Sequence, residues 1–364
     1  MTVNEKKNFT PENKAKVLII GSGGIGMVAS HTLEHKGLSE VTIVVRSAYE
    51  QASEEGYHIQ SATFGEHKNW KPTRIVKDVP QALTDDNGNE VKYDYVFVSL
   101  KNTPDGPMTC EDIIEPAIKS NPDTCIILVQ NGIDIEKPMI ERFPGTTILS
   151  GVSLIGTTTI GTHVNQKSPD NLTLGAFKND TLKDGEHLSS SKIEDFVDLY
   201  FVEGKNTVNI DHDVGLTRWK KLVYNAAVNT VTALVNLDCS RAVMANVKEP
   251  LYRPIMNEIY EIAKSEGYIL PPELKEVMMS ITDGLFYTPS MLVDVRLGRL
   301  IEVEVIVGNP VKIAEKNGVN APHLTMMYHL LKMIQFRQKE KLGLVKVDET
   351  VCVRKDTEEY GKGF

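Results

Sequence analysis

The chain has 364 residues, of which 41% are hydrophobic and 24% charged, and its formal net charge is −9. This composition is ordinary for a soluble globular enzyme, and the length favours two domains over one. The acidic balance argues against a general nucleic-acid or membrane-surface binder, and the four cysteines are spaced like neither a zinc site nor a disulfide framework.

Localisation is inferred from features that the sequence lacks. No apolar run approaches the ~20 residues needed to span a bilayer. The first residues, Met1 to Asn8, contain neither the apolar segment of a secretory signal nor an arginine typical of a mitochondrial presequence. We therefore expect a cytoplasmic protein without a membrane partner. No cluster of histidines and carboxylates has metal-ligand spacing, so no metal is expected.

The first half of the chain alternates apolar strands with helical stretches. Buried strands are expected at 16–20, 41–45, 95–100 and 125–129, and a helix at 27–33. Such alternation is typical of a doubly wound parallel sheet. The sequence therefore predicts an α/β fold with an N-terminal Rossmann-type dinucleotide-binding domain.

A glycine-rich turn, Gly21-Ser22-Gly23-Gly24-Ile25-Gly26, joins the first strand to the first helix. In this G-x-G-x-x-G pattern, Gly21 allows the tight turn, Gly23 lets the backbone approach a pyrophosphate, and Gly26 permits close helix–strand packing. The N–H groups at the helix start can bind the anion. The pattern predicts a dinucleotide site; the alternative is a glycine-rich turn without a ligand.

Polar residues follow three further strands. Arg46 stands where an NAD-specific site usually carries an acidic residue, and an arginine suits a 2′-phosphate, so NADP(H) is favoured. Lys101 and Asn131 follow the next two strands and should share one edge of the sheet with Gly21 and Arg46. The alternative for Arg46 and for Lys101 is an ordinary solvated side chain.

The pattern changes after residue 150. Alternating Thr and Gly at 156–161 and 171–175 predict antiparallel hairpins that extend the sheet, and the polar segment 179–192 predicts a surface loop or insertion. From 214 onward the chain reads as helices, ending in a loosely packed tail of about 20 residues. We therefore expect a dinucleotide-binding domain at 1–213 and a helical substrate domain at 214–364, with the boundary near Asp213.

A polar stripe interrupts an otherwise apolar predicted helix at 219–235. Lys221, Asn225 and Asn229 are four residues apart, so on an α-helix they share a face roughly 80° wide. A buried lysine and two buried amides need hydrogen-bond partners, so they either satisfy one another or face a polar ligand. Lys220 lies about 100° away around the helix, which indicates a solvated or phosphate-facing lysine.

These motifs, together with 290–299 and the segment Ile301-Glu302-Val303-Glu304, resemble the ketopantoate reductase (2-dehydropantoate 2-reductase) family over roughly residues 16 to 315. The resemblance implies a Rossmann domain followed by a helical domain, with the active site in the cleft between them. It also implies reduction of the C2 ketone of 2-dehydropantoate by NADPH, giving (R)-pantoate on the route to coenzyme A.

The resemblance also implies roles for individual residues. Lys221 resembles the general acid that protonates the nascent alkoxide, and Glu302 its partner, which holds the ammonium and contacts the hydroxyl. The other implied contacts are Asn225, Asn229 and Ser290 with substrate, Asn131 with nicotinamide or substrate, and Arg46 and Lys101 with cofactor phosphates. The alternatives are a structural Lys–Glu pair and, for Ser290, a serine that only starts a helix after Thr288-Pro289.

Two departures from the family pattern concern the substrate. The segment 236–240, which contains Cys239, stands where many relatives carry Gly and another Asn, and Gly308-Asn309 reverses the usual order. The rival hypotheses are a related D-2-hydroxyacid dehydrogenase acting on another branched 2-oxo acid, and a non-catalytic reductase-like binding protein. The oligomeric state stays open, with a homodimer as one alternative.

Overall fold

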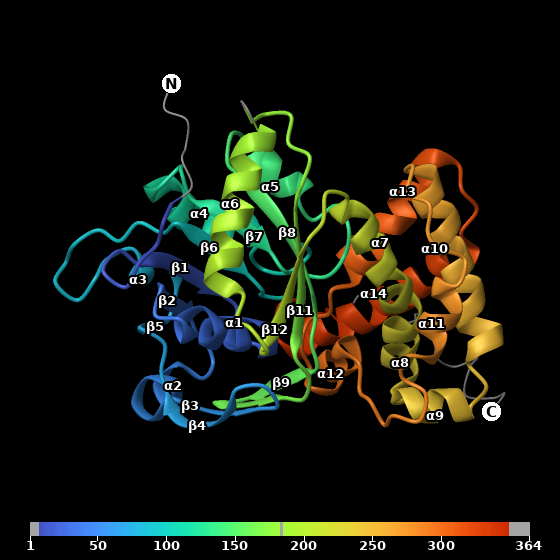
Figure 1. Cartoon of the computed structure of the whole chain (residues 1–364). Helices are drawn as coiled ribbons and strands as arrows, with labels where there is room; N and C mark the ends of the chain where they lie inside the picture. The colour runs from blue at the N-terminus through green and yellow to red at the C-terminus, as the bar shows by residue number, and fades with distance from the viewer. Residues whose placement is uncertain (1–6, 183–184, 349–364) are drawn as a thin grey trace.

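The computed structural model describes residues 7–182 and 185–348. Strands and helices alternate as far as residue 210, and from Val214 onward the described chain is helical. Figure 1 shows the sheet with its covering helices on one side of the molecule and the helical region on the other. This arrangement confirms the predicted fold class, an α/β Rossmann-type domain followed by an all-helical domain.

The main sheet has eight strands in the order β12-β11-β8-β7-β6-β1-β2-β5. Their bounds are β1 Ala15–Ile20, β2 Ser39–Val44, β5 Arg74–Val76, β6 Tyr95–Val98, β7 Cys125–Leu128, β8 Ile148–Leu154, β11 Asp170–Ala176 and β12 Asn206–Ile210. The strands from β5 to β8 are parallel, whereas β11 pairs antiparallel with β8. The four strands predicted from the sequence lie side by side at the centre.

The central strands are almost entirely buried because both faces of the sheet are covered. In β1, Val17 and Ile19 enter the core formed with α1 (Gly24–His35) and α6 (Gly185–Tyr200). Leu18 and Ile20 enter the opposite core, beneath α3 (Val79–Ala82), α4 (Cys110–Ser120) and α5 (Lys137–Arg142). This second core continues into the helical region, so the sheet and those helices pack as one body.

The predicted surface loop at 179–192 is wrong for its second half. Helix α6 begins at Gly185 and packs on the sheet, with Phe196 against the rings of Tyr95 and Phe97. Within the predicted loop, Lys192 is buried, and its ammonium lies 5.7 Å from the centre of the Tyr95 ring. The apolar residues that anchor this helix, Ile193 to Tyr200, lie beyond the segment that the prediction considered.

The expected antiparallel extension of the main sheet is confirmed for 171–175, which lie in β11, but it is wrong for 156–161, which lie in a separate sheet. Strands β9 (Thr157–Ile160) and β10 (His163–Gln166) do form an antiparallel hairpin. However, β10 pairs in parallel with β3 (Tyr57–Ser61), which pairs with β4 (Gly65–Trp70), so these four strands form a separate sheet. Figure 1 shows this small sheet beneath α1 and α2 (Tyr49–Glu55).

The helical region begins where the Asp213 side chain accepts a hydrogen bond from the Leu216 N–H and caps α7. The domain boundary near Asp213 stays a prediction. The remaining elements are α7 Val214–Tyr224, η1 Asn225–Asn229, α8 Thr230–Val235, α9 Cys239–Met244, η2 Lys248–Tyr252, α10 Arg253–Ser265, α11 Leu274–Ser280, α12 Ser290–Arg296, η3 Glu304–Gly308, α13 Asn309–Asn317 and α14 Pro322–Lys341. Most of the predicted tail, 349–364, lies outside the described residues.

No helix in the described part of the chain combines the length and apolarity needed to cross a membrane. The polar stripe does not lie on one continuous α-helix as predicted. Its central part, η1, is a turn of π-helix between α7 and α8. A π-turn inserts an extra residue into the helix and is frequently found at functional sites.

A buried histidine makes stability depend on pH. His31 on α1 packs against His67 and Trp70 of the small sheet, and burial, with His67 and His35 nearby, lowers the pKa of His31 from 6.5 to about 4. Because the unfolded chain binds this proton more tightly, stability falls as pH falls from 6.5 towards 4, by about 3 kcal/mol for this group.

We therefore expect His31→Gln, which cannot take up a proton, to lose less stability than the wild type between pH 7 and pH 4. Urea unfolding at several pH values measures this difference. His212→Gln, at an exposed position, is the control and should follow the wild type. Equal pH dependence in wild type and His31→Gln would contradict the assignment.

Candidate active site

The glycine-rich turn between β1 and α1 is tightly packed at Gly21 and Gly26 and open at Gly23. Gly21 has a φ of +121°, and a Cβ there would lie 2.5 Å from the Leu100 nitrogen. A Cβ on Gly26 would lie 1.8 Å from the Gly21 carbonyl oxygen, whereas one on Gly23 would meet nothing within 4 Å. Only glycine therefore fits at Gly21 and Gly26, and the open space lies at Gly23.

This opening fits a dinucleotide pyrophosphate. Helix α1 begins after Gly23 without a side-chain cap and without an acidic residue in its first turn. Its first N–H groups therefore lack intrahelical partners, and the positive end of the helix dipole favours an anion there. Ser22, Gly24 and Ile25 occupy the remaining positions of the turn, and Ile25 packs against the core under α1.

The other predicted cofactor contacts lie at the same sheet edge, but they differ in environment. Arg46 is exposed shortly after the end of β2. Lys101, after β6, reaches the helical region instead: its Nζ lies 2.7 Å from Asp294 Oδ2 and 3.5 Å from Glu302 Oε2. Burial lowers the pKa of Lys101, but these two carboxylates outweigh it and raise the pKa above its usual range. A contact of Lys101 with a cofactor phosphate stays a prediction.

Glu302 lies at the centre of a polar cluster between the sheet and the helices. Its carboxylate accepts hydrogen bonds from the Asn102 backbone N–H at 3.1 Å and from Asn131 Nδ2 at 3.3 Å. The expected direct contact with Lys221 is absent from the contacts of the described residues. Lys221 Nζ instead donates to the Ser153 carbonyl oxygen at 2.8 Å, while the oxygens of Glu302 are contacted from the loops after β6 and β7.

Lys221 lies in a small pocket at the carboxyl end of the sheet. Burial and the neighbouring Arg218 lower the pKa of Lys221 to about 8, although the Glu302 and Asp170 carboxylates act in the opposite direction. The pocket is lined by Gln130, Asn131, Gly132, Val152, Arg218, Lys221, Leu222 and Asn225. Three predicted site residues, Asn131, Lys221 and Asn225, thus meet in one cavity.

Asn229 and Ser290 lie behind this pocket. Asn229 Oδ1 accepts from the Met291 N–H at 3.0 Å and so caps α12, while its Nδ2 donates to Ser290 Oγ at 3.2 Å and to Asn225 Oδ1 at 3.4 Å. The polar stripe therefore partly satisfies itself. Direct substrate contacts of Asn229 and Ser290 stay predictions, whereas a connection to the pocket through Asn225 is present.

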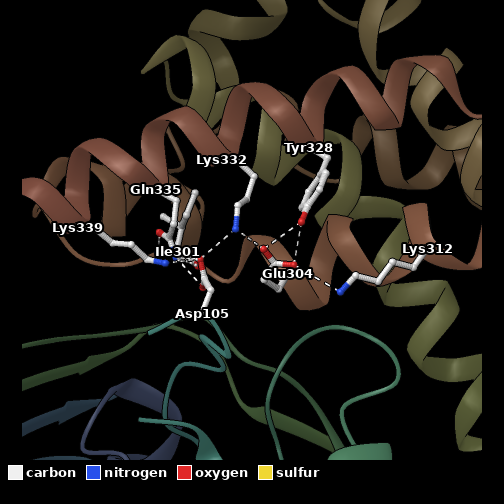
Figure 2. Close-up of polar contacts among 8 residues, drawn as sticks. All are labelled: Asp105, Ile301, Glu304, Lys312, Tyr328, Lys332, Gln335 and Lys339. Atoms are coloured by element: carbon white, nitrogen blue, oxygen red, sulfur yellow. Dashed lines mark hydrogen bonds and ion pairs between the residues drawn. The ribbon is translucent and has the colours of Figure 1, made fainter. Parts of the chain in front are cut away.

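A second cluster, missed by sequence reasoning, anchors the loop that carries Lys101. Asp105 accepts hydrogen bonds from Lys339 Nζ at 2.9 Å and from Gln335 Nε2 at 3.1 Å, both on α14 (Figure 2). Gln335 also accepts from the Ile301 N–H at 2.9 Å. The same side chain thus fixes the 101–105 loop and the residue before Glu302. Residue types alone give no signal for a contact between such distant segments.

Sequence reasoning also missed Arg218, which lines the pocket three residues before Lys221. Its position close to Lys220 and Lys221 gave no signal that separates it from a surface arginine. Cys239, where the sequence departs from the family pattern, is buried, and its Sγ lies 3.7 Å from the Tyr224 hydroxyl. Cys239 is not among the residues that line the pocket.

Comparison with known proteins agrees with this geometry. The family described as "Ketopantoate reductase PanE/ApbA" matches residues 17–179, and its C-terminal counterpart matches residues 213–335. The chain is 40% identical to the uncharacterized protein YDL144C of Saccharomyces cerevisiae, covering 94% of this chain and 99% of that protein. It is 27% identical to the 2-dehydropantoate 2-reductase of a Nostoc species, covering 90% and 97%.

Solved structures share the fold. The 2-dehydropantoate 2-reductase of Methylococcus capsulatus matches with a TM-score of 0.69 and 30% identity, covering 89% of this chain and 97% of that one. A D-mandelate dehydrogenase, solved with NADH and anilino(oxo)acetate, matches in fold with a TM-score of 0.71 at 20% identity, covering 89% and 99%. The two family matches cover most of the chain, and the chain therefore belongs to the ketopantoate reductase family.

Proposed function

We propose that this protein is an NADPH-dependent reductase that converts 2-dehydropantoate to (R)-pantoate for coenzyme A synthesis. The observation that carries the proposal is the pocket in which Lys221 lies beside Asn131 and Asn225, at the sheet edge that also holds the glycine turn. Membership of a reductase family supports the reaction class. The name of the Nostoc relative supports the substrate.

The proposed cofactor is NADP(H), which supplies a hydride to the substrate when bound. The open space at Gly23 and the uncapped start of α1 suit its pyrophosphate. Arg46, exposed beyond β2, suits a 2′-phosphate, because a guanidinium can form charge-assisted hydrogen bonds with phosphate oxygens. The solved D-mandelate dehydrogenase carries NADH, so the fold alone does not select NADPH, and Arg46 is the residue proposed to favour NADPH in this chain.

Lys221 is the proposed general acid. Reduction of a ketone places negative charge on its oxygen, and an adjacent ammonium both stabilises that charge and donates the proton. With a pKa of about 8, Lys221 is mostly protonated at neutral pH and still gives up its proton readily. Its hydrogen bond to the Ser153 carbonyl fixes the ammonium at the pocket wall.

Glu302 keeps its proposed role as partner of Lys221 and is proposed to act in a second way as well. It accepts a hydrogen bond from Asn131 Nδ2 and forms an ion pair with Lys101, so it positions residues on both strand-end loops. One N–H of the Asn131 amide is donated to Glu302, so the second N–H and the amide oxygen can serve substrate or nicotinamide. Asn225 supplies a second amide to the lining of the pocket.

A second candidate is a D-2-hydroxyacid dehydrogenase that acts on another branched 2-oxo acid. It is supported by the departure from the family pattern at 236–240. In this segment Cys239 packs against Tyr224, and none of the five residues is among those that line the pocket. Faster turnover of 2-oxoisovalerate or benzoylformate than of 2-dehydropantoate would favour this candidate. Binding of NADPH without turnover of any 2-oxo acid would favour the non-catalytic alternative.

We expect Lys221→Ala to lower the rate of NADPH oxidation with 2-dehydropantoate by ~10²–10⁴-fold, because the proton donor is lost. Lys220→Ala, the matched control on the same helix, should stay within about twofold of wild type, since that side chain lies off the pocket face. Absorbance at 340 nm measures both. Equal losses in the two variants would contradict the assignment of Lys221.

Arg46→Ala should discriminate between the two nicotinamide cofactors. Loss of a charge-assisted contact worth roughly 1.5–3 kcal/mol should raise the KM for NADPH by about 10- to 100-fold and leave the KM for NADH nearly unchanged. Lys92→Ala, at another exposed position, is the control. If Arg46→Ala changes both KM values equally, Arg46 does not bind the 2′-phosphate.

A further inference from the structure

Arg218 uses its whole guanidinium inside the protein. The residue is 5% exposed, and its Nε donates to Ser150 Oγ at 2.7 Å. One terminal nitrogen donates to the carbonyl oxygens of Gln130 (2.9 Å) and Gly132 (3.1 Å). The other donates to those of Leu128 (2.9 Å) and Gly151 (3.4 Å). All five N–H groups of the arginine therefore have acceptors, and none remains for a ligand.

These acceptors belong to the strand ends that form the pocket. Leu128 is the last residue of β7, Gln130 and Gly132 flank Asn131, and Ser150 and Gly151 lie in β8. Arg218 itself lies one turn before Lys221 on α7. One side chain thus joins the helix that carries the proposed proton donor to the loop that carries the proposed substrate amide.

The charge of Arg218 has no directly bonded counter-ion. All five acceptors are neutral oxygens, and among the contacts of the described residues no carboxylate forms an ion pair with this guanidinium. The Glu136 carboxylate is near enough to favour the charged form, but burial outweighs it and lowers the pKa of Arg218. Because an unpaired buried charge costs several kcal/mol, a neutral side chain would be the simpler way to fill this space.

We propose that Arg218 is a positioning residue of the reductase: it fixes Lys221 against the Asn131 loop and supplies a positive charge beside the Lys221 ammonium. This inference rests on the function proposed above. A fixed positive neighbour disfavours a second positive charge, so it makes the ammonium a stronger acid. Lys221 then transfers its proton more readily to the alkoxide formed at the substrate C2 oxygen, and its side chain becomes a neutral amine.

Charged groups from several elements face Lys221. Arg218, on the same helix, and Lys101, after β6, lower the pKa of Lys221, as does burial. Glu302, before η3, and Asp170, on β11, raise it. Asp170 is itself engaged by Ser153 Oγ at 2.6 Å and by the Tyr200 hydroxyl at 2.7 Å. Of the charged neighbours, Arg218 has the largest effect.

Two substitutions separate the charge of Arg218 from its hydrogen bonds. Arg218→Met removes both, whereas Arg218→Lys keeps a positive charge and loses the five-donor geometry. The first readout is kcat and KM for 2-dehydropantoate reduction between pH 6 and pH 10. The second is competitive acetylation of Lys221 by acetic anhydride, measured by peptide mass spectrometry over the same pH range. Acetylation reports the titration of Lys221 without substrate.

In the wild type we expect the alkaline fall in kcat and the onset of Lys221 acetylation to coincide near pH 8. Arg218→Met should move both upward by about one pH unit and lower kcat at pH 7 at least tenfold. Arg218→Lys should lower kcat but leave both titrations near their wild-type position. NADPH binding, followed by fluorescence, should change by less than about twofold in either variant, since the glycine turn is not involved.

A titration of Lys221 that is unchanged in Arg218→Met would overturn the inference, whatever the loss of activity. If Arg218→Met does not fold, Arg218→Gln provides a second neutral variant that keeps some hydrogen bonds, and the same titration decides. If the wild type reduces no 2-oxo acid, the proposed function fails. The acetylation result then still shows whether Arg218 sets the acidity of Lys221, so the two failures are distinguishable.

Discussion

The arrangement of the site depends on how the Arg218 guanidinium crosses from α7 to the end of β7, the loop that follows it and the middle of β8. Figure 1 places α7 where the sheet meets the helical region, and one hydrophobic core runs across this junction. Apolar packing holds the two parts together but has little directional preference. Five hydrogen bonds to one arginine do have direction, and they fix which face of α7 lies over the Asn131 loop. Lys221 and Asn225 therefore face the pocket, and Leu222 closes it.

The centre of the fold could be predicted because its sequence signal is local. Strands β1, β6 and β7 contain unbroken runs of buried apolar residues, β2 is rich in β-branched residues, and the glycine turn stands directly between β1 and α1. The small sheet could not be predicted, because β10 pairs with β3 across a long stretch of chain, and Thr- and Gly-rich alternation says nothing about the partner strand. Helix α6 was missed for a different reason: its anchoring residues, Ile193 and Phe196, follow the mostly polar first two turns, Gly185 to Lys192.

The sequence predicted which residues lie in the candidate site better than it predicted the contacts between them. A four-residue spacing was enough to align Lys221 with Asn225, even though a π-turn follows Tyr224. The partner of Lys221 could not be predicted from spacing, because Lys221 and Glu302 lie far apart in the sequence and other residues also contact the carboxylate. Asn102, Asn131 and Lys101 engage it instead. Arg218 shows no sequence pattern that distinguishes it from a surface arginine, and only its buried acceptors reveal its role.

The pocket around Lys221 is proposed to direct a hydride to the C2 carbon of a 2-oxo acid. The most direct measurement is mass spectrometry of the product formed from 2-dehydropantoate and NADPH deuterated at both C4 positions. We expect pantoate that carries one deuterium at C2 and forms at the same rate as NADPH is oxidised. Pantoate without deuterium, or no product from a protein that binds both NADPH and 2-dehydropantoate, would contradict it.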